Sequence, residues 1–435
     1  MYILLIGSGA REHAIARVIK KSPQNPALFC FGSSANPGIK SLSDGYQVGK
    51  ITDPTAILNF AREQKIELAF IGPEAPLAAG VSDILWNNQI PCVGPKQKLA
   101  QLESSKGFTR DLQAKYQIPG QPRYARFNDL SGAEKFLREL GENNYVVKAD
   151  GLMGGKGVKV AGEHLNSIKE ALEYCQELVE AASAFVIEEK LIGQEFSLMS
   201  FCDGAHLAHM PPVQDHKRAF DNDLGPNTGG MGSYSCSDHL LPFLTEKDVK
   251  AAQKINQATA AALKKEFSEN YQGILYGGFM VTKTGVKLIE YNARFGDPEA
   301  MNVLSILSSD FVKICQAIVN GNLDQSLAVF ENLSTVCKYA VPEGYPDNPV
   351  KNQRIDVSQV QNPDNLYFGS VDERSEGLFE LGSRAVAIVG QDQNLFLAEQ
   401  KVEQEINRIT GPLFHRRDIG TKELIDKKVS MMKKL

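Results

Sequence analysis

The sequence predicts an α/β protein built from an N-terminal parallel-sheet domain, a larger central α+β region and a small C-terminal α+β module. The chain has 435 residues, a length typical of two to four domains. In the first hundred residues, short apolar runs alternate with helical stretches, which favours a parallel sheet. Farther along, strand-like segments flank glycine-rich turns. We expect the three parts to cover residues 1–102, 103–325 and 326–435.

The N-terminal domain begins with an apolar run, YILLI, that ends at a glycine turn and is followed by a helical stretch. Similar short apolar runs recur before residue 102 and are interpreted as further strands of one sheet. The predicted strands span residues 2–6, 27–31, 66–71 and 90–93, and the first helix spans about 10–20.

The central region begins with a helix over 104–116, for which Ser104 or Ser105 supplies the N-cap. A Pro-Gly turn at residues 119–120 then leads into a part, about 120–192, that we expect to carry a glycine flap. The strands expected in the central region span 144–149, 157–161, 184–188, 195–201, 274–282 and 286–292, with a long helix near 246–266. In the C-terminal module we expect a strand at 384–389 and a helix from about 397.

Composition narrows the possible functions. The net charge is −5 and 43% of the residues are hydrophobic, so the basic excess of a nucleic-acid-binding protein is absent. The seven cysteines are scattered and form no CxxC pair, which argues against a disulfide framework or a zinc site and favours a reducing compartment. We find neither a signal peptide nor an apolar run long enough to span a membrane, and therefore expect a cytoplasmic protein.

The first candidate site is the glycine turn Gly7-Ser8-Gly9 at the start of the first helix. Backbone N–H groups and the helix dipole at such a turn favour a phosphate group. A dinucleotide-binding fingerprint would need a third glycine where Glu12 stands, which disfavours a Rossmann oxidoreductase. A plain tight turn is the alternative. His13 is interpreted either as a ligand contact or as a helix-start histidine.

A second glycine-rich segment runs from Lys148 to Val158. It is not a Walker A loop, because Gly157 follows Lys156 where Ser or Thr is required. Strand alternation places Lys148 on the face opposite the apolar residues on either side of it. Two lysines that bracket a glycine loop favour triphosphate binding over a plain surface hairpin.

The third candidate is the strand end at Glu188 and Glu189, which leads to a turn at Gly193. The edge of such a strand could bind an adenine through its backbone, and a nearby carboxylate could accept ribose hydroxyls. A solvated run of charges is the alternative interpretation.

The fourth candidate lies on a predicted strand where Glu290 and Asn292 point to the same side. Two hard oxygen ligands side by side suit Mg²⁺, which completes its octahedron with phosphates and water. Arg294 follows them and could hold a phosphate or carboxylate through its planar fork. Polar residues on an exposed edge strand are the alternative.

The fifth candidate combines a basic cluster, Gln214-Asp215-His216-Lys217-Arg218, with a second glycine-rich loop over 225–232. This combination predicts a clamp for a substrate anion.

Taken together, these stretches resemble the ATP-grasp family of phosphoribosylamine–glycine ligases, also called glycinamide ribonucleotide synthetases. Nine motifs carry the resemblance: GSGxREHA at 7–14, NPG at 36–38, GPExPL at 72–77, DGLxxGKGV at 150–158, EExLxGxExS at 188–197, QDHKR at 214–218, GPNTGGMG at 225–232, NxRFGDPE at 292–299 and RRDIG at 416–420. The family pattern is altered at Ala300-Met301-Asn302, around Tyr367–Val371, and at Gly382-Ser383-Arg384.

The resemblance implies a pre-ATP-grasp N-terminal domain, central ATP-grasp domains, and an enzyme that joins glycine to 5-phosphoribosylamine with ATP and Mg²⁺ or Mn²⁺ in purine biosynthesis. It implies metal ligation by Glu290 and Asn292. The implied nucleotide site contains Lys106, Lys148, Gly154, Gly155, Lys156, Gly157, Glu188, Glu189, Lys190 and Glu195. The implied substrate site contains Gly9, Arg11, Asn36, Gly38, Glu74, Asp215, Lys217, Arg218 and Arg294. Catalytic roles fall to Arg294, Lys148, Lys156, Asp215 and Arg218.

Two other interpretations stay open at this point. Another carboxylate–amine ligase or a carboxylase of the same fold would share the nucleotide loop, and a non-catalytic nucleotide sensor would need no paired metal ligands. We expect only small-molecule partners, with no nucleic acid and no membrane, and a monomer or weak homodimer.

Overall fold

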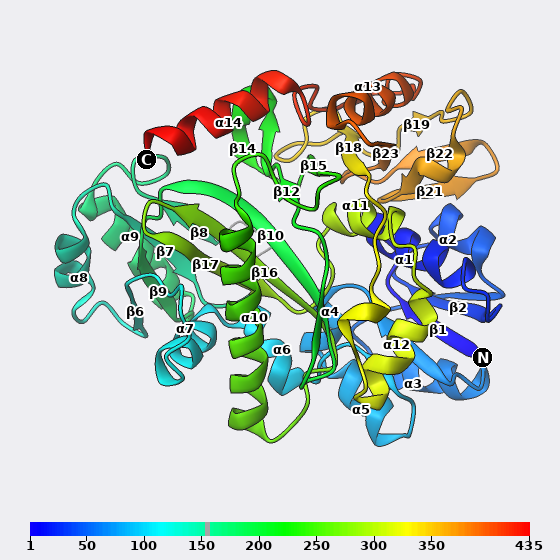
Figure 1. Cartoon of the computed structure of the whole chain (residues 1–435), viewed down its shortest axis with the longest axis horizontal. Coiled ribbons are helices and arrows are strands. Elements are labelled where there is room, and N and C mark those ends of the chain that lie inside the picture. Colours follow the sequence, from blue (N-terminus) through cyan, green and yellow to red (C-terminus); the bar gives the residue numbers. More distant parts are fainter. Residues whose placement is uncertain (153–156) are drawn as a thin grey trace.

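The computed structural model describes residues 1–152 and 157–435 (Figure 1). The N-terminal part is a parallel five-stranded sheet in the order β3-β2-β1-β4-β5. Strand β1 is buried from Ile3 to Ile6, as expected for a central strand covered by helices on both faces. The elements of the N-terminal part are β1 Tyr2–Ile6, α1 Ala10–Lys20, β2 Ala27–Gly32, α2 Pro37–Leu42, β3 Gly45–Val48, α3 Pro54–Glu63, β4 Leu68–Ile71, α4 Glu74–Ala78, α5 Val81–Asn87, β5 Cys92–Val93 and α6 Gln97–Ser104.

A four-stranded antiparallel sheet in the order β6-β9-β7-β8 follows. Helices α8 and α9 cover it, and its apolar side chains form a hydrophobic core of their own, separate from the main core of the protein. This part therefore packs as a unit. Its elements are α7 Lys106–Lys115, β6 Tyr124–Phe127, α8 Ala133–Leu140, β7 Tyr145–Ala149, β8 Val158–Val160, α9 Ile168–Glu180 and β9 Phe185–Glu189.

The central sheet is also antiparallel, in the order β11-β10-β16-β17, and the long helix α10 packs along three of its strands. The Thr245 hydroxyl caps this helix by accepting the Asp248 N–H, and the Asp248 carboxylate accepts the Thr245 N–H in return. The elements are β10 Gly193–Cys202, β11 Leu207–His209, α10 Glu246–Phe267, β16 Gly273–Thr282, β17 Gly285–Asn292, α11 Glu299–Ser305 and α12 Phe311–Asn320.

The sheet of the C-terminal module has the order β12-β15-β18-β23-β20, and two of its strands come from the central region of the sequence. A separate two-stranded ribbon, β13–β14, lies beside it. The predicted boundary near residue 325 therefore separates, in sequence, strands that pair in space. The elements are β12 Gln214–Asp215, β13 Arg218–Phe220, β14 Leu224–Asn227, β15 Gly232–Ser235, β18 Ser334–Pro342, β19 Arg354–Ile355, β20 Leu366–Phe368, β21 Val371–Arg374, β22 Gly377–Glu380, β23 Val386–Asp392, α13 Leu395–Ile406, β24 Leu413–Phe414 and α14 Lys422–Lys434.

Several sequence-based boundaries need correction. The helix expected over 104–116 is interrupted, because α6 ends at Ser104 and Ser105 caps α7 by accepting the Phe108 N–H at 3.0 Å. Helices α8, α9, α11, α12 and α14 had not been anticipated. In the described parts of the chain, none of the helices combines the length and apolar character that a membrane span requires.

Candidate active site

A cavity of about 740 Å³ lies where the β6-β9-β7-β8 sheet faces the central sheet. Strands β7 and β9 line one side and β10 and β17 line the other. Arg11 and Glu74 reach it from the N-terminal part, while Arg384 and Lys428 reach it from the C-terminal module. A volume of this size is typical of a small-molecule site at a junction between domains.

Lys148 lies on the wall of this cavity in a buried ionic triad. Its Nζ is 2.8 Å from Glu188 Oε2, while Arg110 Nε is 2.7 Å from Glu188 Oε1. Burial alone would raise the pKa of Glu188, but the two cations outweigh it and lower that pKa to about 2. Glu188 is therefore a fixed anion that orients Lys148. Arg110 lies in none of the sequence motifs and was therefore missed by sequence reasoning.

Lys106 and Asp150 connect α7 to the end of β7. Lys106 Nζ donates to the Gly151 carbonyl at 2.9 Å, and its pKa is lowered, mainly by burial. The Asp150 carboxylate accepts hydrogen bonds from the Ser105 hydroxyl and the Gly107 N–H. These contacts place the Lys106 ammonium at the start of the glycine-rich segment that follows β7. The predicted nucleotide ligands Gly154, Gly155 and Lys156 lie outside the described residues; Gly157 lines the cavity.

Hydrogen bonds to neighbouring segments fix the side chains at the end of β9. Glu189 Oε1 accepts the Arg123 N–H at 3.0 Å, and Lys190 Nζ donates to the Ala161 carbonyl at 2.7 Å. Both residues still line the cavity.

Lys217 and two carboxylates form a second charged group. Lys217 Nζ is 3.3 Å from Glu195 Oε2 and 3.9 Å from Asp215 Oδ2, and these carboxylates raise its pKa. Burial raises the pKa of Asp215. Arg218 makes an ion pair with Glu163 and donates to the Gly225 carbonyl at 2.9 Å. The structure therefore brings the predicted residues of the 214–218 segment to the same cavity.

Glu290 and Asn292 both line the cavity from β17. Burial would raise the pKa of Glu290, but Lys217, Lys148, Lys106 and Arg294 outweigh it and lower that pKa. An ionised carboxylate beside an amide oxygen is a donor set that fits Mg²⁺ or Mn²⁺. The described residues contain no cluster of three or more His, Cys, Asp or Glu that could hold a metal by itself, so a cation here would need phosphate or water oxygens as well.

Arg294 connects the end of β17 to the N-terminal part. Its Nη2 is 2.9 Å from Glu103 Oε1, its Nε is 3.3 Å from Glu74 Oε2, and it also donates to Asn292 Oδ1 at 3.3 Å. Burial would raise the pKa of Glu74, but Arg294 and Arg11 outweigh it and lower that pKa. Glu103, which sequence reasoning missed, fixes one edge of the guanidinium group.

Three predicted substrate ligands, Gly9, Asn36 and Gly38, do not line this cavity. Asn36 caps α2 and donates to the Ser8 and Phe368 carbonyls. A Cβ on Gly38 would lie 2.0 Å from Cε1 of His13. The structure therefore supplies packing and capping reasons for Asn36 and Gly38, and their binding role stays a prediction.

His13 joins the N-terminal part to the C-terminal module. Its Nδ1 accepts the Phe368 N–H at 3.0 Å and its ring stacks on that phenyl group. Burial holds the pKa of His13 well below its usual range. Of the two interpretations of His13, the structure favours a neutral helix-start histidine.

Sequence reasoning also missed two further lining residues, Glu299 and Arg384. Glu299 Oε1 accepts the Tyr276 hydroxyl at 2.7 Å, and burial followed by the Asp215 charge raises the pKa of Glu299 to about 7. Arg384 donates to the Gly229 carbonyl at 2.7 Å and pairs with Asp297 at 3.2 Å. Arg384 stands outside the nine motifs, and the motif that ends at Glu299 does not reveal its partners, because tertiary contacts bring each residue to the site.

These features define a class of protein. A glycine-rich connection between antiparallel strands, lysines fixed by a buried carboxylate, and an acid–amide pair on the facing sheet are the arrangement expected of an ATP-grasp ligase. Models of the phosphoribosylglycinamide synthetase N domain, ATP-grasp (A) domain and C domain match residues 1–103, 104–300 and 335–422. The chain belongs to the phosphoribosylglycinamide synthetase family.

Curated relatives agree. The phosphoribosylamine–glycine ligase of Methanosarcina acetivorans is 48% identical over 435 residues, covering 100% of this chain and 98% of that protein. The enzyme of the same name from Methanocaldococcus jannaschii is 49% identical over 444 residues, with 100% of both chains covered.

Solved structures share the fold. The phosphoribosylamine–glycine ligase of Thermotoga maritima has a TM-score of 0.82 at 27% identity, covering 96% of this chain and 100% of that one. Biotin carboxylase from Campylobacter jejuni, solved with a β-γ-ATP complex, has a TM-score of 0.71 at 15% identity, covering 99% and 95%, which shows the fold alone. The predicted family, fold class and ligase activity are confirmed, while the roles of individual residues stay predictions.

Proposed function

We propose that this protein joins glycine to 5-phosphoribosylamine, using ATP, to give glycinamide ribonucleotide, ADP and phosphate through glycyl phosphate. The observation that carries the residue roles is one cavity in which Lys106, Lys148, Lys217 and Arg294 surround the Glu290 carboxylate. Neighbouring carboxylates hold three of these cations in place: Glu188 holds Lys148, Glu195 holds Lys217 and Glu103 holds Arg294. The four cations therefore form a preoriented set of donors, which suits the oxygens of a polyphosphate.

The nucleotide end of the reaction falls to the flap-bearing part. Lys148, held by Glu188, and Lys106, held by the Gly151 carbonyl, would bind phosphate oxygens. Glu189, Lys190 and Glu195 would bind the nucleoside, and the roles predicted for Gly154, Gly155, Lys156 and Gly157 stand as part of this proposal.

The metal end falls to β17. Glu290 and Asn292 would hold a divalent cation, Mg²⁺ or Mn²⁺, which when bound neutralises phosphate charge and supplies several kcal/mol of transition-state stabilisation. The choice between these two ions is open to measurement with each metal separately.

The chemistry needs positioning more than a side-chain nucleophile. A glycine carboxylate oxygen attacks the γ-phosphorus, and the bond from that phosphorus to ADP breaks. The amine of phosphoribosylamine then attacks the acyl carbon, forming the C–N bond as phosphate leaves. Arg294 and Lys217 would offset the developing charge, with Asp215 and Arg218 orienting the substrates.

The phosphoribosylamine end would lie toward the N-terminal part. Arg11 and Glu74 support this arrangement because they line the cavity beside Arg294. Gly9, Asn36 and Gly38 do not line the cavity themselves and would then contribute to phosphoribosylamine binding from behind the lining residues. We also propose that the protein is cytoplasmic, in keeping with its seven unpaired cysteines. We further propose that it is a monomer or a weak homodimer.

The test is ADP release from ATP and Mg²⁺ with freshly generated phosphoribosylamine, with and without glycine. We expect release that needs both substrates and equals the glycinamide ribonucleotide formed. Release with a different carboxylate or amine, but not with this pair, would keep the ATP-grasp chemistry and reject the named substrates.

A further inference from the structure

The ribbon β13–β14 carries Arg218 and directly follows Lys217, yet its own structure gives it little support. It pairs with no other strand of the described chain, and a two-stranded ribbon alone is only marginally stable in water. Its turn contains two consecutive left-handed residues, Asn222 at φ 63° and Asp223 at φ 58°. Such a conformation persists where surrounding contacts enforce it.

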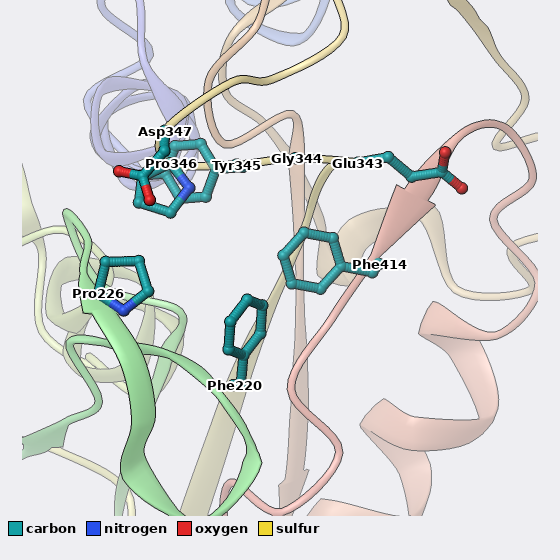
Figure 2. Close-up of a pocket in the computed structure, with 8 residues that line it drawn as sticks. All are labelled: Phe220, Pro226, Glu343, Gly344, Tyr345, Pro346, Asp347 and Phe414. Atoms are coloured by element: carbon teal, nitrogen blue, oxygen red, sulfur yellow. The ribbon is translucent and has the colours of Figure 1, made fainter.

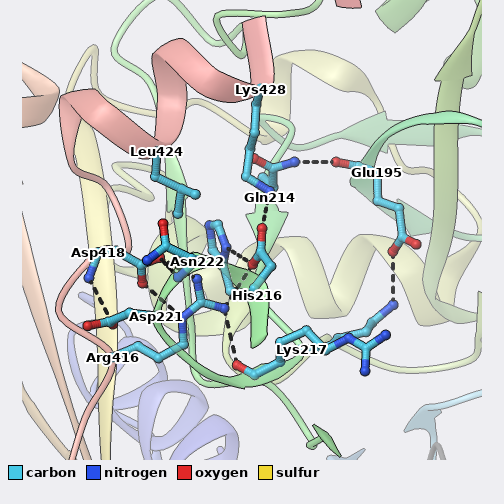
Figure 3. Close-up of polar contacts among 12 residues, drawn as sticks. Glu195, Gln214, His216, Lys217, Asp221, Asn222, Arg416, Asp418, Leu424 and Lys428 are labelled. Atoms are coloured by element: carbon cyan, nitrogen blue, oxygen red, sulfur yellow. Dashed lines mark hydrogen bonds and ion pairs between the residues drawn. The ribbon is translucent and has the colours of Figure 1, made fainter. Parts of the chain in front are cut away.

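The C-terminal segment supplies those contacts, as Figure 3 shows. Arg416 Nη1 donates to the Arg218 carbonyl at 3.1 Å and to Asp223 Oδ1 at 2.9 Å. The remaining donors of its guanidinium bind the two carboxylate oxygens of Asp418, at 2.9 and 2.8 Å. The Arg416 side chain is fully buried, so this charge cannot exchange its partners for water.

Backbone N–H groups of both segments add further hydrogen bonds. Asp418 Oδ2 accepts the Asn222 N–H at 2.7 Å, and Asp221 Oδ1 accepts the Arg417 N–H at 2.9 Å. Each segment thus donates backbone N–H groups to a carboxylate of the other. This reciprocal arrangement fixes the left-handed turn at both of its ends.

Two more contacts complete this set of contacts to the ribbon, which we call the anchor. Lys428 Nζ on α14 is 3.2 Å from Asp223 Oδ2, and Lys428 itself lines the active-site cavity. On the outer face of the ribbon, the Phe220 ring lies against Phe414 with centroids 6.1 Å apart, beside a small cavity of about 290 Å³ (Figure 2).

We propose that Arg416 is a positioning residue that sets the placement of Lys217 and Arg218 in the active site by holding the β13–β14 ribbon. The inference rests on the proposed function and extends it to a residue about 200 positions away in sequence. Lys217 Nζ lies among Glu195, Asp215 and Glu290, so a small displacement of its backbone changes the charge presented to the substrate. A displacement of about 1 Å in such a site lowers the rate on the order of 10²-fold.

The experiment is a double-mutant cycle between Arg416→Gln and Lys217→Met, with kcat and KM measured for glycine and phosphoribosylamine. Single turnovers with enzyme in excess keep the slow double variant measurable. If Arg416 acts through the 217–218 segment, Arg416→Gln lowers kcat/KM about 10²-fold in the otherwise wild-type enzyme and only a few-fold on the Lys217→Met background. Arg416→Lys, which keeps the charge and loses the fork, should fall between Arg416→Gln and wild type.

Equal losses on both backgrounds, or no loss in Arg416→Gln, would overturn the proposal. Should Arg416→Gln fail to fold, Lys428→Met tests the same anchor, because removing it frees Asp223 on the other side. The control is Lys422→Met on α14, whose exposed pair with Asp426 includes no residue of the ribbon and whose loss should leave turnover unchanged. Absence of glycinamide ribonucleotide with the wild-type enzyme would refute the proposed function itself, a separate result.

Discussion

Replacing Arg110 by Met is expected to destabilise the protein by removing one cation of the buried triad. Arg110 binds both carboxylate oxygens of Glu188, at 2.7 and 2.9 Å, and also donates to the Leu288 and Ile289 carbonyls. It therefore connects the flap-bearing sheet to the central sheet. In Arg110→Met, Glu188 keeps only Lys148 as a cationic partner among these contacts.

Two lines of reasoning give the size of this destabilisation. Breaking a buried, hydrogen-bonded ion pair by removing one partner costs about 3–5 kcal/mol. Independently, lowering the pKa of Glu188 from 4.5 to about 2 corresponds to roughly 3 kcal/mol of net stabilisation, because the attraction of Arg110 and Lys148 exceeds the cost of burial. We therefore expect a loss of about 3 kcal/mol in the free energy of unfolding at neutral pH.

The pH dependence has a definite sign. Since the folded pKa of Glu188 lies below its unfolded value, its contribution is fully present above about pH 4.5 and is lost as the pH falls toward 2. The difference between wild type and Arg110→Met should be largest at neutral pH and should shrink below pH 4.5.

Urea unfolding at about pH 7 and about pH 3, followed by circular dichroism, measures both effects. The matched control is Arg138→Met, which removes an exposed arginine from an i,i+4 pair with Glu134 and should cost about 1 kcal/mol or less. The double variant Arg110→Met/Glu188→Gln should recover part of the loss, because the buried carboxylate is gone. A loss in Arg110→Met no larger than in Arg138→Met, or one independent of pH, would refute the reasoning.

Three further predictions concern single residues. Glu290→Ala should lower glycine-dependent ADP release by on the order of 10³-fold, because it removes the acid of the proposed metal-binding pair, while the circular dichroism spectrum is unchanged. Normal release would remove the metal assignment. Glu299→Gln should stabilise the ligand-free protein at pH 8 but not at pH 4. Burial raises the pKa of Glu299 to about 7, so the stability of the wild-type protein falls as the pH rises from about 4.5 through that value. Equal urea midpoints for the variant and the wild type at pH 8 would contradict this prediction. Gly38→Ala should cost about 1–3 kcal/mol, because its Cβ would overlap the His13 ring, and His13→Ala should relieve part of that loss in the double variant; additive losses would argue against the clash.

The sequence by itself determined the local chemistry of this protein. The alternation of apolar and helical stretches predicted the parallel sheet at residues 2–93, and strand periodicity placed Glu290 and Asn292 on one face of β17. These features are local, because the side chains of a strand alternate wherever that strand is placed. The family motifs added the ligase activity, which the comparisons confirm.

Tertiary structure decided which residues share the cavity and which ones hold them. Arg110, Glu103 and Arg384 stand outside the nine motifs, and the motifs that contain Glu299 and Arg416 do not reveal the partners of these two residues. Each of the five nevertheless pairs with or orients a residue of the site. It also decided that β12 and β15 join the C-terminal sheet. The physical reason is that burial and pairing of charges depend on long-range packing, which brings together side chains that are as far apart in sequence as Arg218 and Arg416.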